Sequence, residues 1–330
     1  MDNGFRKGME TIDKDVNQVN GKKELLNNPA YETWILLSRT RYTIARLRDI
    51  ELAKIGLSPE QSAILQMLIN RGGKSTVTQL SISWLHLRHS VSTLVNRMQK
   101  QGLLKKIKYP KQKEFEIVIT EMGKNLAEKI KTDSIDKIFS FLSEEERQKL
   151  SQYLKLLLIR TLSLSEGNID LHQHNILNEQ YYNPAFNTWR LLDSARSVIG
   201  RLRNLELAKI GLSPEQSSIL QMIQTRGGKS TLKQLSISGI RLHHSVSTLV
   251  NRMQKQGLVN KIKYPKQKEF EIVITEMGRM MYDKITMAPI DTIFSFLSSE
   301  EMQRLSQYLK TIFSTAHGFI EINNHEPDHL

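Results

Sequence analysis

The sequence predicts a mainly α-helical α+β fold with small β-hairpins, built as two copies of one domain. Three observations support this prediction: an internal repeat, helix-capping residues at the same places in both copies, and one short β-rich stretch in each copy. The chain has 330 residues, which is enough for two domains of ordinary size.

The repeat has a constant offset of 155 residues. Residues 55–123 align with residues 210–278 without insertion or deletion, and the two stretches differ at 12 of 69 positions. Two copies this long indicate two whole domains, because solenoids repeat much shorter units. We therefore divide the chain into an N-terminal extension (1–24), a first unit (25–162), a polar linker (163–180), a second unit (181–316) and a C-terminal tail (317–330).

Four helices are predicted at the start of each unit, from apolar residues at helical spacing. Ser58, Pro59 and Gln61 stand at the N-cap, N1 and N3 positions of the second helix. Thr76 and Gln79 form a similar capping box for the third helix. In the first unit the four helices are expected over about residues 29–54, 59–71, 77–83 and 88–101.

A lysine-rich β-hairpin is predicted after the fourth helix. The stretch LLKKIKYPKQKEFEIVIT has two β-rich runs, about residues 104–108 and 114–119, on either side of a Pro-Lys-Gln-Lys tip. A fifth helix is expected after Thr120, and Ser143 with Glu146 caps a sixth. Each unit is therefore expected to hold one pair of strands among its helices.

The string GKST, at residues 73–76 and 228–231, matches the end of a phosphate-binding P-loop. A P-loop also needs a preceding strand and a glycine five residues before the glycine of this string. Leu68 and Ile223 occupy that position, and a helix is expected before each string. We interpret the string as a glycine stop between two helices.

The charge balance suits a polyanionic partner. Lys and Arg number 47 against 34 Asp and Glu, which gives a net charge of +13. Such a balance suits nucleic acid or an anionic membrane surface but shows no specificity by itself.

Composition also excludes several classes of site. The absence of cysteine excludes disulfides, thiolate catalysis and zinc sites built on cysteine. No uncharged apolar run approaches the ~18 residues of a membrane helix, and the start does not resemble a signal peptide. We therefore expect a cytoplasmic protein without a membrane partner. His172 and His174 lie in the polar linker, and we assign no metal or cofactor to them.

Two short helices joined by a tight turn and followed by a lysine-rich hairpin describe a winged helix-turn-helix. Val91, Leu94, Val95 and Met98 share one face of the fourth helix and are expected to anchor it to the core. The other face carries short polar and cationic groups that suit base edges and phosphates in a major groove. The expected DNA contacts are Arg88, His89, Ser90, Ser92, Thr93, Asn96, Arg97, Lys108, Lys111 and Lys113 in the first unit, and His243, His244, Ser245, Ser247, Thr248, Asn251, Arg252, Lys263, Lys266 and Lys268 in the second.

These motifs resemble the DNA-binding core of the MarR family of bacterial transcription regulators. The resemblance rests on LSPEQSAILQML, STVTQLSI and HSVSTLVNRMQKQGLLKKIKYPKQKEFEIVITEMG, and it covers both units. It implies tandem winged helix-turn-helix domains whose helical dimerisation regions form an intramolecular pseudo-dimer. It also implies a regulator, typically a repressor, that binds a pseudo-palindromic operator in double-stranded DNA and responds to a small aromatic or anionic effector.

The chain departs from the family at the wing and between its own copies. The family's wing usually carries Asp-x-Arg, whereas this chain has Lys-Gln-Lys at residues 111–113 and 266–268. Arg88 becomes His243 in the second copy, so we expect two half-sites that differ at one or two base pairs, with a guanine preferred by Arg88. The effector candidates, which also suit a core or helix-pairing role, are Trp34, Arg41, Tyr42, Met67, Trp189, Arg196 and Met222.

Other classes of protein stay open beside the regulator. A non-specific architectural or RNA-binding protein would explain the charge but not the polar helix face in both copies. A protein-interaction module would keep the winged helix without DNA binding. An enzyme is disfavoured, because the sequence has no glycine-rich phosphate loop, metal-ligand spacing or nucleophile motif. A dimer of whole chains is the alternative to an intramolecular pair.

Overall fold

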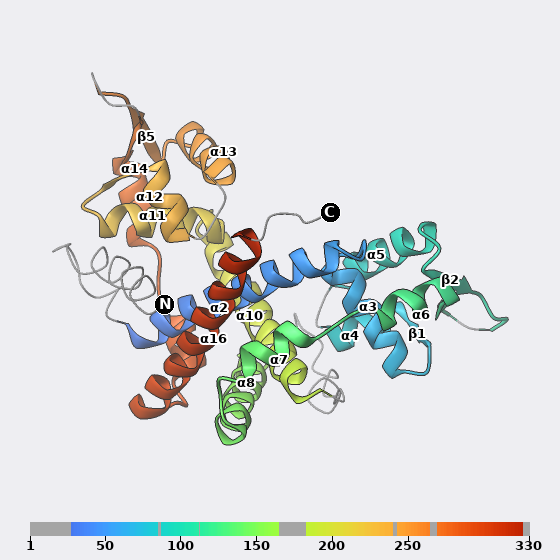
Figure 1. The fold of residues 1–330 in the computed structure, drawn as a ribbon. Helices are drawn as coiled ribbons and strands as arrows, with labels where there is room; N and C mark the ends of the chain where they lie inside the picture. Colours follow the sequence, from blue (N-terminus) through green and yellow to red (C-terminus); the bar gives the residue numbers. More distant parts are fainter. Residues whose placement is uncertain are drawn as a thin grey trace. The chain divides into compact units, whose positions relative to one another are not determined.

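The computed structural model consists of helices and two small antiparallel sheets (Figure 1). It describes residues 28–84, 87–111, 113–164, 183–239, 243–264 and 269–325. The predicted N-terminal extension, nearly all of the linker with His172 and His174, and the wing residues Lys266 and Lys268 lie outside the described residues. The mainly helical α+β class is confirmed.

Contacts divide the chain into two compact units, and each unit contains residues of both sequence copies. The smaller unit joins Met1–Glu32 with Arg201–Thr292, and the larger unit joins Thr33–Gly200 with Ile293–Leu330. Helices α2 (Pro29–Ala53) and α10 (Pro184–Lys209) each begin in one unit and continue in the other.

The larger unit contains one winged helix, and its elements follow the expected order. They are α3 (Pro59–Asn70), β1 (Lys74–Thr76), α4 (Val77–Trp84), α5 (Arg88–Lys100), β2 (Leu104–Ile107), β3 (Glu116–Ile119) and α6 (Glu121–Glu128). The sheet has the order β1-β3-β2, with both pairs antiparallel. The expectation of a single strand pair was wrong, because β1 adds a third strand beside β3.

Local capping fixes where these helices begin and end. The side chain of Ser58 accepts from the backbone of Gln61, and the Gln61 side chain accepts from the backbone of Ser58, which is the predicted capping box. The same exchange between Thr76 and Gln79 begins α4. Gly73 has φ of 88°, a left-handed conformation that glycine adopts without strain. The GKST string therefore lies between two helices, as expected.

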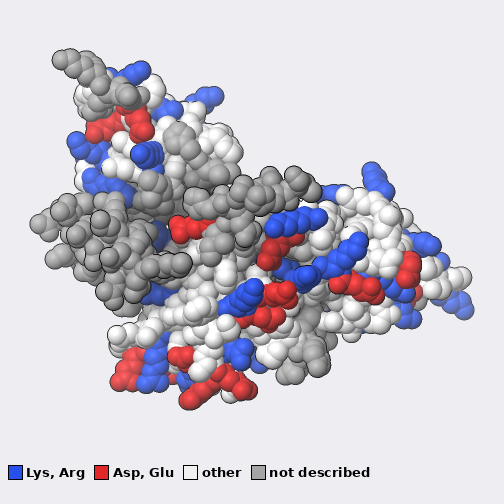
Figure 2. Space-filling model, in the orientation of Figure 1, with Lys and Arg blue, Asp and Glu red and all other residues white. Residues whose placement is uncertain are grey.

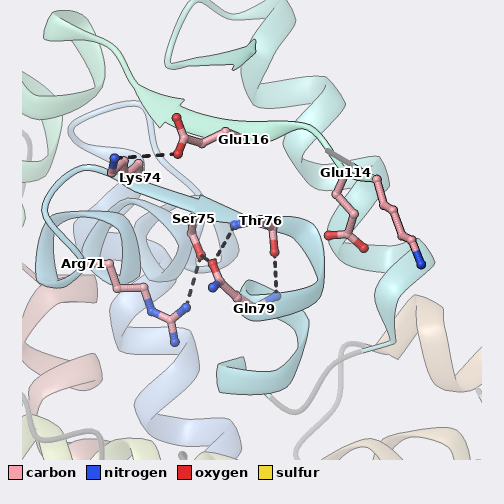
Figure 3. Close-up of a pocket in the computed structure, with 8 residues that line it drawn as sticks. Arg71, Lys74, Ser75, Thr76, Gln79, Glu114 and Glu116 are labelled. Atoms are coloured by element: carbon pink, nitrogen blue, oxygen red, sulfur yellow. Dashed lines mark hydrogen bonds and ion pairs between the residues drawn. The ribbon is translucent and has the colours of Figure 1, made fainter. Parts of the chain in front are cut away.

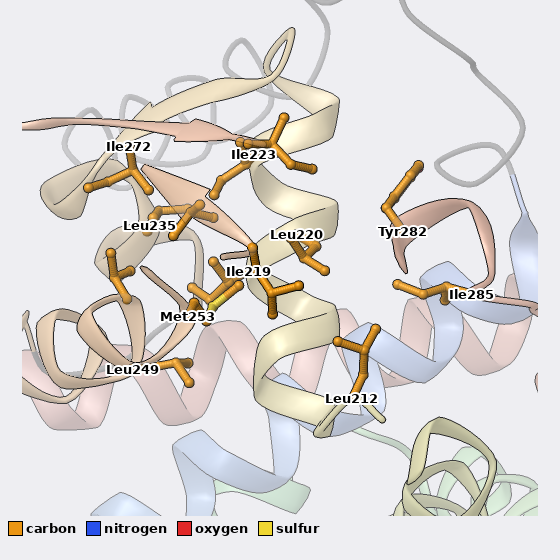
Figure 4. Close-up of a cluster of buried hydrophobic side chains, with 14 of the residues drawn as sticks. Leu212, Ile219, Leu220, Ile223, Leu235, Leu249, Met253, Ile272, Tyr282 and Ile285 are labelled. Carbon is orange, nitrogen blue, oxygen red and sulfur yellow. The ribbon is translucent and has the colours of Figure 1, made fainter. Parts of the chain in front are cut away.

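The smaller unit repeats the same winged helix. Its elements are α11 (Pro214–Thr225), β4 (Lys229–Thr231), α12 (Leu232–Gly239), α13 (His243–Lys255), β5 (Val259–Ile262), β6 (Glu271–Ile274), α14 (Glu276–Asp283) and the start of α15 (Ala288–Phe294). Its core is drawn in Figure 4, where Leu220, Leu235, Met253 and Ile272 converge from α11, α12, α13 and β6. All four side chains are fully buried.

A layer of long helices completes the larger unit. It contains α7 (Asp133–Phe139), α8 (Glu144–Leu164), α16 (Ser299–His325) and parts of α2 and α10. Helix α7 was not among the predicted elements, and α16 runs through residues 317–325, where a tail was expected. Leu150, Leu154, Leu157, Leu309 and Ile312 are completely buried along α8 and α16.

Short polar contacts join helices of the first copy to helices of the second within this layer. The hydroxyl oxygens of Thr33 and Ser306 lie 2.8 Å apart, and those of Ser151 and Thr188 lie 2.9 Å apart. The Thr40 hydroxyl donates to the carbonyl of Leu309 at 3.2 Å. Each of these contacts joins a residue of the first copy to a residue of the second, so the helical layer is built from both copies.

No helix within the described ranges is long and apolar enough to cross a membrane.

Candidate nucleic-acid interface

Helix α5 separates an apolar face from a polar one. Val91, Val95 and Met98 are fully buried and Leu94 nearly so, which confirms the predicted anchoring face. The opposite face is exposed at Arg88, His89, Ser90, Thr93, Asn96 and Arg97, and half-buried at Ser92. Because the anchoring residues fix the rotation of the helix, the polar residues are held on one outward stripe.

The start of α5 is suited to an anion. Its N-cap position is Leu87, which has no side-chain hydrogen bond to the first turn. The first backbone N–H groups of a helix carry a partial positive charge and bind phosphates readily. Arg88 and His89 add their side chains at the same end.

Each wing is tied to its recognition helix by a lysine. The ammonium of Lys106 on β2 donates to the amide oxygen of Asn96 on α5. The equivalent Lys261 on β5 donates to Asn251 on α13. Lys106 and Lys261 are not among the DNA contacts expected from the sequence, although they belong to the lysine-rich runs that mark the hairpins.

On each wing, the ammonium groups of two lysines lie near an exposed phenylalanine ring. The ammonium groups of Lys106 and Lys108 lie 6.0 and 5.2 Å from the ring centroid of Phe115. In the second copy, Lys261 and Lys263 lie 5.7 and 5.5 Å from the ring of Phe270. These are cation–π distances, and they place the ammonium groups on one surface of the wing. In the sequence, this arrangement is indicated by a Lys-x-Lys pattern that precedes a phenylalanine in both copies.

The first wing is also joined to α4 and α5 through Glu114. Arg88 forms an ion pair with this carboxylate, and the hydroxyl of Thr78 donates to it at 2.5 Å. Burial raises the pKa of Glu114, but the hydrogen bond from Thr78 and the charge of Arg88 outweigh burial and leave the pKa below its ordinary value. Glu114 is therefore ionised and bonded at neutral pH, and it holds the Arg88 guanidinium on the wing side of α5.

A pocket of about 590 Å³, lined by polar and charged residues that include Glu114, lies where the wing meets β1 and the start of α4 (Figure 3). Arg71 donates to Ser75 at 3.2 Å, Ser75 donates to Gln79 at 3.1 Å, and Lys74 lies 3.8 Å from Glu116. The remaining lining residues are Thr76, Lys113 and Glu114. The residues of the GKST string thus bond to neighbouring side chains of the same fold.

The second copy presents a matching helix face. His244, Ser245, Thr248, Asn251 and Arg252 are exposed on α13, Ser247 is half-buried, and Lys263 is exposed on the wing. His243 begins α13, and its side chain lies outside the described residues together with Lys266 and Lys268. At the first wing tip, Lys111 and Lys113 are both exposed.

Exposed Lys and Arg side chains are distributed over the surface of the first winged helix. In Figure 2, Lys and Arg side chains project from the face that carries α5 and β2. The exposed cations on these elements and the adjoining wing residues are Arg88, Arg97, Lys100, Lys105, Lys108, Lys111 and Lys113. Such a surface attracts a phosphate backbone over distances up to the Debye length, ~8 Å at physiological salt.

The effector candidates do not gather in one place. Trp34 is buried and lies 5.9 Å from the guanidinium of Arg196. Arg41 forms an ion pair with Asp193 at 2.6 Å. Met67 is part of the winged-helix core of the larger unit, and Met222 packs against that of the smaller unit. Tyr42 is exposed and Trp189 half-buried. Of the seven, the structure brings together Trp34 and Arg196.

Comparison with known proteins gives consistent matches. A model of the MarR family matches residues 55–113. The chain is similar to the HTH-type transcriptional regulator MhqR of Bacillus subtilis (strain 168), with 28% identity over 134 residues, covering 39% of this chain and 92% of that protein. The chain is thus similar, over residues 55–113, to the MarR family and, over 134 residues, to an HTH-type transcriptional regulator. Regulators of this family are not enzymes.

Solved structures of similar proteins were also found. One is the organohalide sensing RdhR transcriptional regulator in its ligand-free form, with 28% identity and a TM-score of 0.44, covering 50% of this chain and 97% of that one. Another is a mutant MarR from E. coli complexed with operator DNA, with 18% identity and a TM-score of 0.37, covering 40% of this chain and 97% of that one.

Proposed function

We propose that this chain is a sequence-specific regulator of transcription, acting as a ligand-responsive repressor on double-stranded operator DNA. The observation that carries the proposal is the exposed polar face of α5 and α13, each beside a lysine-rich wing and each opposite a buried apolar face. The MarR family match to residues 55–113 supports it.

In this proposal each recognition helix enters a major groove. Short side chains such as Thr93 and Asn96, with Thr248 and Asn251 in the second copy, reach base edges. His89, Ser90, Ser92 and Arg97, with their equivalents His244, Ser245, Ser247 and Arg252, bind neighbouring bases and phosphates. The wing lysines Lys108, Lys111, Lys113, Lys263, Lys266 and Lys268 bind the backbone and the adjacent minor groove.

We further propose that the two copies pair inside one chain as a pseudo-dimer. Reciprocal contacts support this arrangement, because a two-fold interface repeats each contact with its partners exchanged. Asn28 donates to Asp291 at 2.6 Å in the smaller unit, and the equivalent Asn183 donates to Asp136 at 2.8 Å in the larger unit. The Thr33–Ser306 and Ser151–Thr188 contacts are a second such pair.

A small aromatic or anionic effector is proposed to bind the helical layer near Trp34 and Arg196. A buried indole beside a guanidinium offers an aromatic ring both a stacking surface and a positive charge. Such an effector would relieve repression by changing how the helical layer holds the winged helices.

Selection of the intact chain on a random duplex pool at near-physiological salt tests the function. We expect a pseudo-palindrome with half-sites about one helical turn apart. Charge reversal at Lys111, Lys113, Lys266 and Lys268 should abolish the enrichment. Binding of duplexes or RNA without an enriched sequence would instead show that the chain is a non-specific nucleic-acid-binding protein. If the charge-reversed variant still binds DNA, the wings do not take part in the binding.

A further inference from the structure

Within the described residues, the first copy shows an attachment of its wing whose residues are not all repeated in the sequence of the second copy. Both copies have the bond from a β-strand lysine to the recognition-helix asparagine, Lys106 to Asn96 and Lys261 to Asn251. The first copy adds a second attachment through Glu114, which the ion pair with Arg88 joins to α5 and the hydrogen bond from Thr78 joins to α4.

The residues of this second attachment are replaced in the second copy. Glu269 keeps the carboxylate, but Lys233 stands at the position of Thr78 and His243 at the position of Arg88. Glu114 is partly buried, with 26% of its side chain exposed, whereas Glu269 and Lys233 are exposed. The remaining DNA-facing residues of the two recognition helices are identical.

The ion pair also restricts what Arg88 can do. A guanidinium that reads guanine presents two N–H groups to the base edge. Arg88 directs one terminal nitrogen to Glu114 instead, and that carboxylate is itself fixed by Thr78. Turning Arg88 toward a base would break a charge-assisted hydrogen bond and leave a partly buried carboxylate with one partner fewer.

We propose that Arg88 is a positioning residue that holds the first wing against α5, so that the first copy meets its half-site with a fixed wing and the second copy with a looser one. The inference rests on the proposed DNA binding and deepens it. The two half-sites are then read with the same base preference at α5 and α13 but with unequal affinity. This differs from the expectation that Arg88 selects a guanine.

The attachment itself is tested without DNA, on the intact chain. Arg88→His gives the first copy the residue of the second, and Glu114→Gln removes the charge of the acceptor. We expect the backbone amides of the non-proline residues in 107–116 to exchange about two- to five-fold faster in both variants, the range expected for loss of an exposed ion pair. Unchanged exchange in both variants would overturn the proposal.

Lys105→Asn is the matched control. It removes one positive charge from the same wing, and Asn260 already stands at this position in the second copy. Lys105 is exposed. Exchange in the wing should therefore stay as in the parent chain, whereas acceleration equal to that of Arg88→His would show that net charge, not the bond to Glu114, controls the wing.

Selection on duplex DNA then separates positioning from base reading. Arg88→His and Glu114→Gln should both weaken binding to the first half-site by a similar factor for every base, and the double variant should weaken it no further. A changed preference at one base pair in Arg88→His alone would mean that Arg88 reads a base. If the parent chain enriches no sequence, the proposed function fails, whatever the exchange data show about the attachment.

The converse variant tests sufficiency. Lys233→Thr combined with His243→Arg rebuilds the attachment in the second copy. We expect slower amide exchange in the second wing and tighter binding to the second half-site, and no change in either would contradict the proposal.

Discussion

At the scale of single residues, two glycines allow a helix to approach the backbone more closely than any other residue could. A Cβ atom on Gly123 would lie 2.4 Å from the carbonyl oxygen of Leu103, and one on Gly278 would lie 2.1 Å from that of Leu258. Real Cβ atoms do not approach a carbonyl so closely. The first turns of α6 and α14 therefore pack directly on the chain that leads into the wing.

Gly123→Ala should destabilise the fold. The added methyl group meets backbone that cannot move without displacing β2, so we expect a loss of about 1–3 kcal/mol in the free energy of unfolding, measured by denaturant titration. Gly200→Ala is the control, because a Cβ there meets nothing closer than 3.6 Å and the first copy already has Ala45 at this position. The control should be neutral or gain up to about 1 kcal/mol. Equal losses in both variants would contradict the packing argument.

Tyr31 should make stability depend on alkaline pH. It packs against the core of the smaller unit and bonds to Gln221, and burial raises its pKa to about 12. An unfolded tyrosine titrates near 10, so between about pH 10 and 12 the unfolded chain loses the proton first. The stability contribution of Tyr31 is fully present below pH 10 and is lost as the pH rises through 12.

Tyr31→Phe provides the measurement, because Phe186 already stands at the equivalent position. Denaturant titrations from pH 9 to 12 should show a shallower fall of stability in the variant than in the parent chain. Parallel curves would show that Tyr31 titrates normally.

Residues on one element were predictable from the sequence, and pairs between elements were not. The spacing of Val91, Leu94, Val95 and Met98 is a property of a single helix, and all four are buried as expected. The pairing of Arg88 with Glu114 joins residues 26 positions apart and depends on how the wing folds back on α5. No local pattern contains that information.

At the scale of elements, the helix caps carry measurable stability. Ser58 and Ser213 form complete capping boxes at the starts of α3 and α11. Ser58→Ala and Ser213→Ala should each cost about 1 kcal/mol of unfolding free energy. Ser90→Ala, an exposed serine in the first turn of α5, should stay within about 0.5 kcal/mol of the parent. A larger effect at Ser90 than at the caps would contradict this assignment.

The wings should control the salt dependence of DNA binding. Lys108→Ala and Lys263→Ala each remove an exposed ammonium that a phenylalanine holds on the wing. If each contacts one phosphate, each variant should weaken binding about equally for all sequences and reduce the slope of log K against log salt by about 1. Lys137→Ala, exposed on α7, should leave the slope unchanged. Slopes identical across the three variants would exclude the wing lysines from phosphate contact.

The elements of the first copy that the sequence did not predict are a very short strand and a very short helix. Strand β1 has three residues, too few for a period of two to be visible, and it exists because β3 offers it an edge to pair with. Helix α7 has seven residues, about two turns, and its stability comes from packing Ile135, Ile138 and Phe139 into the helical layer. Both depend on contacts made after the neighbouring elements have formed.

At the scale of the whole molecule, the proposed pairing of the two copies should be independent of concentration. An intramolecular pair never dissociates into free partners, because the linker keeps the local concentration high. Sedimentation should give one species of 38.1 kDa, and the melting temperature should stay constant over a hundred-fold dilution. A mass near twice that value, or a melting temperature that falls on dilution, would indicate the dimer of whole chains.

The repeat was evident in the sequence, but the division into compact units was not. Sequence similarity groups residues by descent, whereas contacts group them by packing. The boundaries of the compact units fall inside α2, near Glu32, and inside α10, near Gly200. Neither helix ends at these points, since each continues unbroken through them.

Because both copies contribute helices to the larger unit, cutting the chain between the copies has a consequence for its folding. A single protease cut between residues 165 and 182 would leave two fragments, each holding only part of the side chains that build the larger unit, since α8 would go with one and α16 with the other. Neither fragment could bury its apolar surface alone, but the two together could. The two fragments would complement each other, so DNA binding by the cut chain would report whether they have associated.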